Sequence, residues 1–256
     1  YDFSKVDSNV KMIFIETPTN PLLDVTDLEK VCKEAKEKGL SIVVDNTFMT
    51  SYLQKPIEKG ADIVVYSATK YYAGHSDIIA GLVTVDDDGL YEKLKCNQKL
   101  IGGILSPFDS FLLNRGIKTL ALRMDKSQEN ALKLAEFLDE HEGIERVYYT
   151  GLKSHKGYEI HKKQASGNGG LLSIELKDNY NINTLCKSLK IFDLAVSLGG
   201  IESLICHPET MTHESYSKDL QKEIGITNQL LRVAVGIEDI DDLIEDFDNA
   251  LKLSKI

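Results

Sequence analysis

Lys70 is the residue of this 256-residue chain whose surroundings most favour covalent chemistry. It comes shortly after a β-branched run over residues 62–66 and is flanked by small and hydroxyl-bearing residues. A lysine amine is a nucleophile only in its neutral form, and the end of a buried strand disfavours the charged form. Because most lysines are exposed to solvent, an ordinary surface lysine is the competing interpretation. Other residues of the chain must decide between the two.

Asp45 ends a second β-branched run, which covers residues 40–45. A turn, a short helical stretch over residues 51–59 and Gly60 separate it from the next run, which predicts one βαβ crossover. Asp45 and Lys70 are then expected at the carboxyl ends of neighbouring strands, where open α/β sheets bind ligands. Pyridoxal phosphate (PLP) needs a lysine to hold its aldehyde and, in many enzymes, a carboxylate beside its ring nitrogen. The two residues fit these roles, although a strand-ending aspartate is also common as a turn residue or a helix N-cap.

Six motifs, spread in order along the chain, resemble those of the Cys/Met-metabolism family of PLP-dependent enzymes. They are ETPTNP at 16–21, VDNTF at 44–48, SATKYYAGHSD at 67–77, SLGGIES at 197–203, MTH at 211–213 and LRVAVGIE at 231–238. The family includes cystathionine γ-lyase, methionine γ-lyase, cystathionine γ-synthase and the O-acylhomoserine sulfhydrylases. The resemblance implies the α/β class and the type I (aspartate aminotransferase-like) fold of PLP enzymes.

The resemblance also implies a division of the chain into two parts. Residues 1–120 are expected to be the remainder of the large PLP-binding domain, with a mostly parallel sheet. Residues 121–256 are expected to form a linking helix and a C-terminal α+β domain. Family members carry an N-terminal third that has no counterpart here, so the chain is expected to be a truncated form that is a poor enzyme alone. The full-length protein is expected to be a homotetramer, a dimer of dimers.

Three further residues near the predicted strand ends are candidates for holding the cofactor. Ser67 and Thr69 flank Lys70 with hydroxyl groups that can donate hydrogen bonds to a phosphate, and capping of the strand end is the alternative. Asn20 follows a proline-held turn. The resemblance implies that it lies near the phenolic oxygen of the cofactor or the substrate carboxylate.

Arg232 lies in a mostly apolar strand over residues 230–235, where a guanidinium group is costly unless it has a partner. The α-carboxylate of a substrate is one partner, because the planar guanidinium can hold it with two hydrogen bonds. An ion pair with one of the many acidic residues of the chain is the alternative. The resemblance favours the carboxylate and implies that Ser197 is the second group that binds it.

The reaction implied by the resemblance is γ-elimination on a sulfur amino acid, either methionine or cystathionine, with Lys70 as the base. The products would be a thiol, a 2-oxo acid and ammonia. Val196 is apolar where eukaryotic cystathionine γ-lyases carry a glutamate, and the stretch 207–213 is similar to methionine γ-lyases, whereas residues 98–107 are nearer to bacterial cystathionine enzymes. γ-Replacement, as in cystathionine γ-synthase or O-acetylhomoserine sulfhydrylase, therefore remains an alternative, and so does a non-catalytic remnant that serves as a scaffold.

The composition restricts the other partners. A formal net charge of −10 argues against nucleic acid or an anionic membrane as a partner. No apolar run approaches the length of a bilayer span, and the four cysteines form no Cys-x-x-Cys pair, so a cytoplasmic location is expected. The six histidines lack the spacing of metal ligands, so no metal is expected. His75, Ser76 and Asp77 have the letters of a hydrolase triad, but adjacent side chains cannot form its relay.

The pattern of apolar residues predicts the elements that position these side chains. A helix over residues 27–38, opened by a capping box of Thr26 and Glu29, is expected between the first two strands. A helix over 119–140 with one apolar face is expected to lead into the second domain. Strands are expected at 12–15, 42–45, 62–66, 82–85, 145–149, 170–176 and 230–235, and further helices at 183–189 and 239–253.

Overall fold

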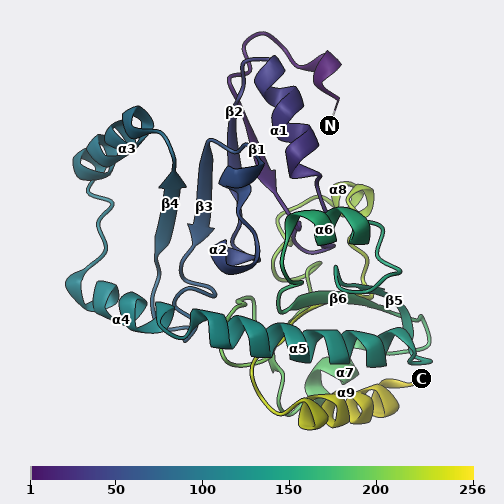
Figure 1. The fold of residues 1–256 in the computed structure, drawn as a ribbon. Coiled ribbons are helices and arrows are strands. Elements are labelled where there is room, and N and C mark those ends of the chain that lie inside the picture. The colour runs from purple at the N-terminus through teal and green to yellow at the C-terminus, as the bar shows by residue number, and fades with distance from the viewer. Residues whose placement is uncertain (1) are drawn as a thin grey trace.

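Two β-sheets, joined in the chain by a long helix, organise the molecule (Figure 1). The structure is a computed structural model and describes residues 2–256. The first sheet has the strand order β1-β2-β3-β4 and the second the order β5-β6-β9-β8-β7. The long helix, α5 (Leu120–Asp139), agrees with the helix predicted over residues 119–140.

The first sheet is mostly parallel, as predicted. Strands β1 (Met12–Glu16), β2 (Ser41–Asp45) and β3 (Ile63–Ser67) are parallel neighbours. Strand β4 (Gly81–Val85) pairs with β3 in the antiparallel direction and forms one edge. The carboxyl ends of β1, β2 and β3 therefore lie along one edge of the sheet, which is where the candidate site residues follow the strands.

The helix α1 (Leu28–Glu37) covers one face of this sheet, and its N-terminus differs from the prediction. The side chain of Asp27, rather than Thr26, caps it by accepting a hydrogen bond of 3.1 Å from the Lys30 amide. The predicted capping box is wrong because Thr26 is held outside the helix, where its amide donates to the Thr17 hydroxyl at 3.0 Å. The remaining short helices here are η1 (Phe3–Lys5), α2 (Thr50–Leu53) and η2 (Pro56–Lys59).

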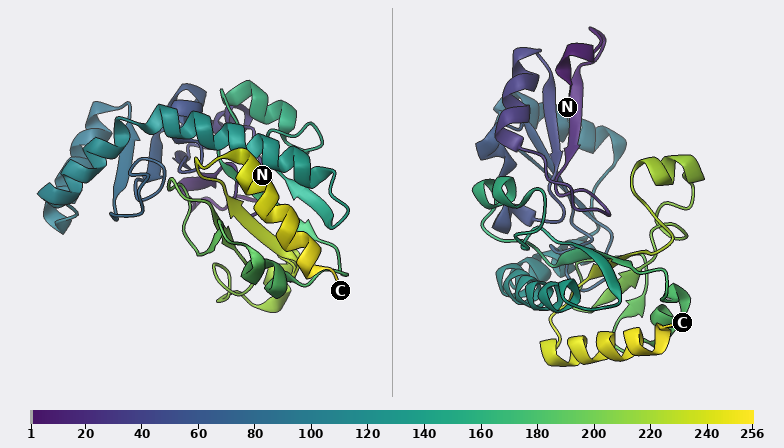
Figure 2. Two further views of the ribbon diagram at one scale, coloured as in Figure 1. Left: turned by 90° about the horizontal axis from the view of Figure 1, so that it is seen from below. Right: turned by 90° about the vertical axis from the view of Figure 1, so that its right-hand side faces the viewer.

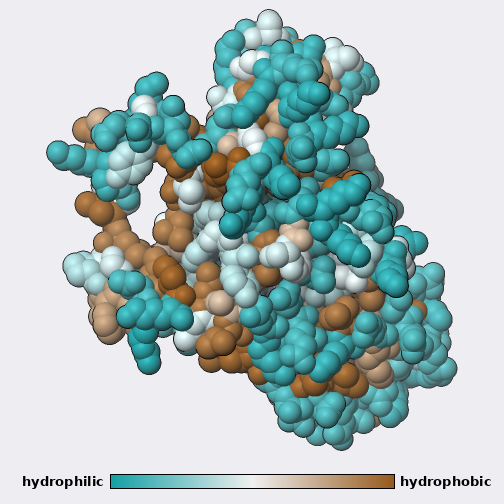
Figure 3. Space-filling view, in the orientation of Figure 1, coloured by the Kyte–Doolittle hydropathy of each residue, from teal (hydrophilic) through white to brown (hydrophobic). Residues whose placement is uncertain are grey.

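The two faces of the first sheet differ in burial. Ile15 and Val44, which point to the face covered by α1, are fully buried. On the opposite face, Phe14 is 60% exposed and Val83 is 57% exposed. The helix α3 (Asp88–Ile101) follows β4 but buries none of its own residues. Figure 3 shows hydrophobic residues around an opening between α3 and the rest of the molecule.

Helix α4 (Pro107–Ile117), which was not predicted, connects α3 to α5. Ser106 caps it by accepting a hydrogen bond of 3.0 Å from the Asp109 amide, and Pro107 occupies its first turn, where a missing amide hydrogen does no harm. The end of α4 packs against the turn that contains Lys70, because a Cβ atom at Gly116 would lie 2.3 Å from the Ala73 carbonyl oxygen.

The second sheet is built around an antiparallel core of three strands, β5 (Ile144–Tyr148), β6 (Leu171–Leu176) and β9 (Leu230–Ala234). Helices α5 and α9 (Ile240–Ser254) lie side by side under it (Figure 2). Leu134, Leu172 and Phe247 are fully buried in the core between them. The remaining elements are α6 (Tyr158–Gln164), α7 (Ile182–Ser188), β7 (Asp193–Leu194), β8 (Leu204–Cys206) and α8 (Lys218–Glu223).

The two sheets share part of one hydrophobic core. Tyr71 and Tyr72, which follow β3, belong to the same buried cluster as Leu198, Leu204 and Ala234 from the C-terminal part. The predicted division at residue 120 falls at the start of α5 and stays a prediction. The shared core brings the end of β3 next to β8 and β9, so Lys70 and Arg232 approach each other from different sheets.

Candidate active site

Lys70 follows β3 in a tight turn at the carboxyl edge of the first sheet. Its amide donates to the Ser67 carbonyl at 3.1 Å, and the Gly74 amide donates to the Lys70 carbonyl at 2.8 Å. The Lys70 amine donates to the hydroxyl of Ser197 at 3.4 Å, which joins the two parts of the chain. The pKa of the Lys70 amine lies below its usual value, mainly because the amine is buried and secondly because of the positive charge of Arg232. The neutral, nucleophilic form is therefore favoured more than in an exposed lysine.

Arg232 on β9 is 2% exposed. One terminal nitrogen, Nη2, donates to the carbonyl oxygens of Val196 at 2.6 Å and Ser197 at 3.0 Å, and Nη1 donates to Asn20 Oδ1 at 3.2 Å. The third nitrogen, Nε, is buried without a hydrogen-bond partner. Burial lowers the pKa of the guanidinium, although a group this basic stays charged at neutral pH.

No carboxylate within residues 2–256 forms an ion pair with Arg232. The ion pair that was the alternative partner of this arginine is therefore absent from the described part of the chain. A buried positive charge without a negative partner is costly. The neutral partners of Arg232 leave its Nε–H group without an acceptor. An anionic ligand would supply both the negative charge and the acceptor. A carboxylate-binding role for Arg232 fits this arrangement and stays a prediction.

Asp45 is half-buried at the end of β2, on the strand next to that of Lys70. Its Oδ1 atom accepts a hydrogen bond of 2.9 Å from the Thr47 amide, and the Thr47 hydroxyl accepts one of 2.8 Å from the Ser67 amide. The turn role considered for this aspartate is thus present, and the turn ties the ends of β2 and β3 together. A ligand role for Asp45 stays a prediction.

The Thr69 hydroxyl is held in place by Ala80, the residue directly before the edge strand β4. Its hydroxyl accepts a hydrogen bond of 2.9 Å from the Ala80 amide and donates to the Ala80 carbonyl at 3.3 Å. This is the capping role that was the alternative to phosphate binding. Ser67 lies at the end of β3 opposite Gly81. The phosphate contacts of both hydroxyl groups stay predictions.

Several polar residues of the site were not assigned a role from the sequence. Glu16, opposite Asp45 in the sheet, accepts a hydrogen bond of 3.3 Å from the Asn20 amide, and burial, with a smaller effect of Asp45, raises its pKa. Asn46 is fully buried and donates to the carbonyl oxygens of Thr50 and Gln54 at 2.9 and 2.8 Å. Glu16 is the last residue of β1, and Asn46 directly follows β2. A polar residue at the end of a predicted strand was the signal that could have identified both as site residues.

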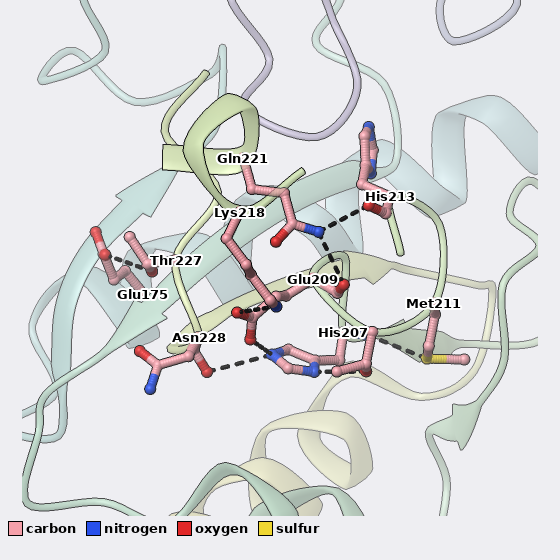
Figure 4. A network of polar contacts seen from close by, with 10 residues as sticks. Glu175, His207, Glu209, Met211, His213, Lys218, Gln221, Thr227 and Asn228 are labelled. Carbon is pink, nitrogen blue, oxygen red and sulfur yellow. Dashed lines mark hydrogen bonds and ion pairs between the residues drawn. The ribbon is translucent and has the colours of Figure 1, made fainter. Parts of the chain in front are cut away.

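Polar contacts hold the segment after β8 together (Figure 4). Gln221 on α8 donates to the carbonyl oxygens of Glu209 at 3.1 Å and His213 at 2.7 Å, and Lys218 forms an ion pair with Glu209 at 2.7 Å. Burial first, and then the charge of Arg232, lowers the pKa of His213, so this ring is close enough to feel the guanidinium. The neutral form of the His213 ring is therefore favoured.

Other patterns noted in the sequence form no site of their own. His75 Nδ1 lies 2.8 Å from the Ala73 carbonyl oxygen, while the Ser76 hydroxyl bonds to Glu202, so the two point to different partners. Within residues 2–256, no group of three or more His, Cys, Asp or Glu side chains is placed to hold a metal ion. No helix in the same range is both long and apolar enough to cross a bilayer.

A half-buried lysine amine lies beside a buried arginine that has no carboxylate partner within residues 2–256, at the strand ends of an α/β sheet. This is the arrangement expected of an amino-acid-binding enzyme with a reactive lysine. Comparison with known proteins agrees with this class. Residues 3–252 match the family described as Cys/Met metabolism PLP-dependent enzyme, and the chain belongs to that family.

Curated relatives carry the names of two lyases. The chain is 48% identical over 244 residues to a cystathionine gamma-lyase of Bacillus subtilis, which covers 95% of this chain and 64% of the relative. It is 51% identical over 242 residues to a cystathionine beta-lyase of Lactococcus lactis, which covers 94% of this chain and 64% of the relative. The chain thus spans less than two thirds of the length of these relatives.

Solved structures confirm the predicted fold. A cystathionine gamma-lyase from Lactobacillus plantarum, complexed with L-serine, has a TM-score of 0.96 and 41% identity over 98% of this chain and 66% of that chain. A cystathionine gamma synthase from Xanthomonas oryzae, in complex with cystathionine, has a TM-score of 0.92 and 43% identity over 94% of this chain and 63% of that chain. These relatives include lyases and a synthase, so they define the family and leave the particular reaction open.

Proposed function

We propose that this chain carries the catalytic lysine and the carboxylate-binding arginine of a PLP-dependent lyase that breaks a carbon–sulfur bond in a sulfur amino acid. Cystathionine is the first substrate candidate, because the lyases it resembles are named for it, and methionine is the second. The observation that carries the proposal is Arg232, a buried charge with one unused donor, next to the Lys70 amine.

The residues of the site fit PLP. Lys70 would hold its aldehyde, Asp45 its ring nitrogen, Ser67 and Thr69 its phosphate, and Asn20 its phenolic oxygen. The unused Nε donor of Arg232 and the absence of a carboxylate partner among residues 2–256 fit an anionic amino-acid ligand beside the cofactor. When bound, PLP supplies an electron sink that stabilises negative charge at Cα of the amino acid.

The residues of this chain then perform three tasks. Arg232 binds the α-carboxylate of the amino acid, which fixes the position of its Cα atom. Ser197, which is hydrogen-bonded to the Lys70 amine, adds a second polar contact near that carboxylate. Lys70, with its lowered pKa, takes the proton from Cα as a neutral amine, and the ammonium group that results then holds this proton.

The position of the broken bond and the fate of the substrate are separate parts of the proposal. γ-Elimination of cystathionine gives cysteine, 2-oxobutyrate and ammonia, whereas β-elimination gives homocysteine, pyruvate and ammonia. γ-Replacement by a thiol, as the similarity to a cystathionine gamma synthase suggests, gives a new thioether and no ammonia. We propose γ-elimination, with replacement as the alternative.

We further propose that the chain by itself turns over substrate slowly. Phe14 and Val83 leave the second face of the first sheet open to solvent, and α3 buries none of its residues. A site at the edge of a sheet that is packed on one face only is less rigidly held, and catalysis requires precise positioning. A homotetramer and a cytoplasmic location remain part of the proposal.

The first experiment combines PLP, borohydride and peptide mass mapping. PLP is added to the protein, the adduct is reduced with borohydride, and the modified peptide is identified, with Lys70→Arg as the control variant. A label on Lys70 that is absent from the variant is expected. Cystathionine is then added, and ammonia, 2-oxobutyrate and pyruvate are measured. A label on other lysines, or equal labelling of the variant, would overturn the role of Lys70 and favour the non-catalytic scaffold.

A further inference from the structure

Arg123 on α5 is a second buried arginine, 6% exposed, and all of its hydrogen-bond partners are neutral oxygens. Nη1 donates to the Tyr71 carbonyl at 2.6 Å. Nη2 donates to the Gly116 carbonyl at 2.9 Å and the Tyr72 carbonyl at 3.4 Å, and Nε donates to the Thr119 hydroxyl at 3.1 Å. One guanidinium group thus holds two consecutive carbonyl groups directly after Lys70, and also the end of α4.

The Lys70 turn packs closely against Arg123 and against the end of α4. A Cβ atom at Gly74 would lie 2.0 Å from Arg123 Nη1, and one at Gly116 would lie 2.3 Å from the Ala73 carbonyl oxygen. Gly74 also has a φ of +74°, which favours glycine. Gly74 and Gly116 therefore have no room for a side chain, and the turn is in close contact with both the guanidinium group and the end of α4.

We infer that Arg123 is a positioning residue for Lys70, because it fixes the backbone of the turn that carries the amine to Ser197 and Arg232. This inference rests on the proposed role of Lys70 as the reactive amine. The burial of Lys70 and the charge of Arg232 account for the lowered pKa of the amine, and Arg123 is not among its causes. Arg123 acts on the position of Lys70 through hydrogen bonds to the backbone and not through its charge.

The geometry of the guanidinium group gives this inference a specific test. A lysine at position 123 keeps the positive charge but loses the planar arrangement of donors that reaches three carbonyl groups. Arg123→Lys and Arg123→Met are therefore expected to release the turn alike, and the retained charge is not expected to rescue the first variant. A released turn exposes Lys70, and the pKa of its amine then rises toward the ordinary value because its main cause, burial, is reduced.

The measurement is the pH dependence of Lys70 acetylation by acetic anhydride in PLP-free protein, followed by mass spectrometry, with the melting temperature recorded for every variant. Asp246→Asn is the matched control. Asp246 is also buried and also holds backbone groups, the amides of Lys190 and Ile191, but these lie in the C-terminal part. We expect the midpoint of Lys70 acetylation to rise in both Arg123 variants and to stay unchanged in the control.

A second pair of variants covers the case in which the Arg123 variants do not fold. Thr119→Val removes the hydroxyl that accepts from Nε, and Thr119→Ser retains it. The valine variant is expected to raise the midpoint and the serine variant to leave it unchanged. Folded variants with an unchanged midpoint, or rescue by Arg123→Lys, would overturn the positioning role. Borohydride labelling of the wild-type protein tests the proposed function separately, since it does not depend on Arg123.

Discussion

Replacing Gly116 by alanine should destabilise the protein, although the same replacement normally strengthens a helix. Gly116 lies in the last turn of α4 and is buried. The added methyl group would lie 2.3 Å from the Ala73 carbonyl oxygen and 3.0 Å from the Tyr72 carbonyl oxygen. Both are backbone atoms of the Lys70 turn, which Arg123 holds through hydrogen bonds to the Tyr71 and Tyr72 carbonyl groups, so neither can move aside as a flexible side chain could.

The size of the effect follows from two opposing contributions. Alanine gains about 1 kcal/mol over glycine inside a helix. Forcing extra atoms into a well-packed region costs about 1–3 kcal/mol, and close contact with two backbone oxygens favours the upper end. The free energy of unfolding should fall by about 2 kcal/mol, which for a chain of this size is a fall in melting temperature of about 4–8 °C.

Gly89→Ala is the matched control for this measurement. Gly89 lies near the start of α3, and the nearest atom to an added methyl group is Asp87 Oδ1 at 3.3 Å, part of an exposed side chain that caps the helix by accepting from the Leu90 amide at 2.6 Å. The two variants are compared by thermal unfolding followed by circular dichroism. We expect Gly89→Ala to be as stable as the wild-type protein or slightly more stable. A Gly116→Ala variant with an unchanged or higher melting temperature would refute the close packing of α4 on the Lys70 turn.

Two further predictions concern charged groups of the site. Arg232→Met should weaken the binding of a sulfur amino acid by about 3 kcal/mol, roughly 150-fold, because a buried charge pair is lost; calorimetric titration of both proteins checks this, and equal affinities would contradict it. Glu16 has a raised pKa in the folded state, so its contribution to stability is present at acidic pH and is lost as the pH rises through the folded-state pKa. Glu16→Gln should therefore raise the melting temperature more at about pH 8 than at about pH 4, and an equal change at both values would count against burial as the cause.

The sequence predicted the elements that have strong periodic patterns and the residues that end them. The β-branched runs before Asp45 and Lys70 are parallel neighbours, as expected, because buried parallel strands are apolar on both faces. It did not predict α3 and α4, since exposed apolar residues such as Leu100 and Phe108 obscure any single buried face. The reversed direction of β4 depends on pairing with β3 and leaves no local signal in the sequence.

Arg123 and Arg232 show why the sequence alone could not separate a supporting arginine from a ligand-binding one. Both lie among apolar residues, both are buried, and neither has a carboxylate partner within residues 2–256. The difference is in their donors: the three nitrogens of Arg123 all have partners, whereas Nε of Arg232 has none. A buried donor without a partner is costly, so the free Nε–H of the charged Arg232 favours the binding of an additional acceptor there. This difference supports the proposed ligand role of Arg232 and the proposed positioning role of Arg123, and it depends on contacts between residues far apart in the chain.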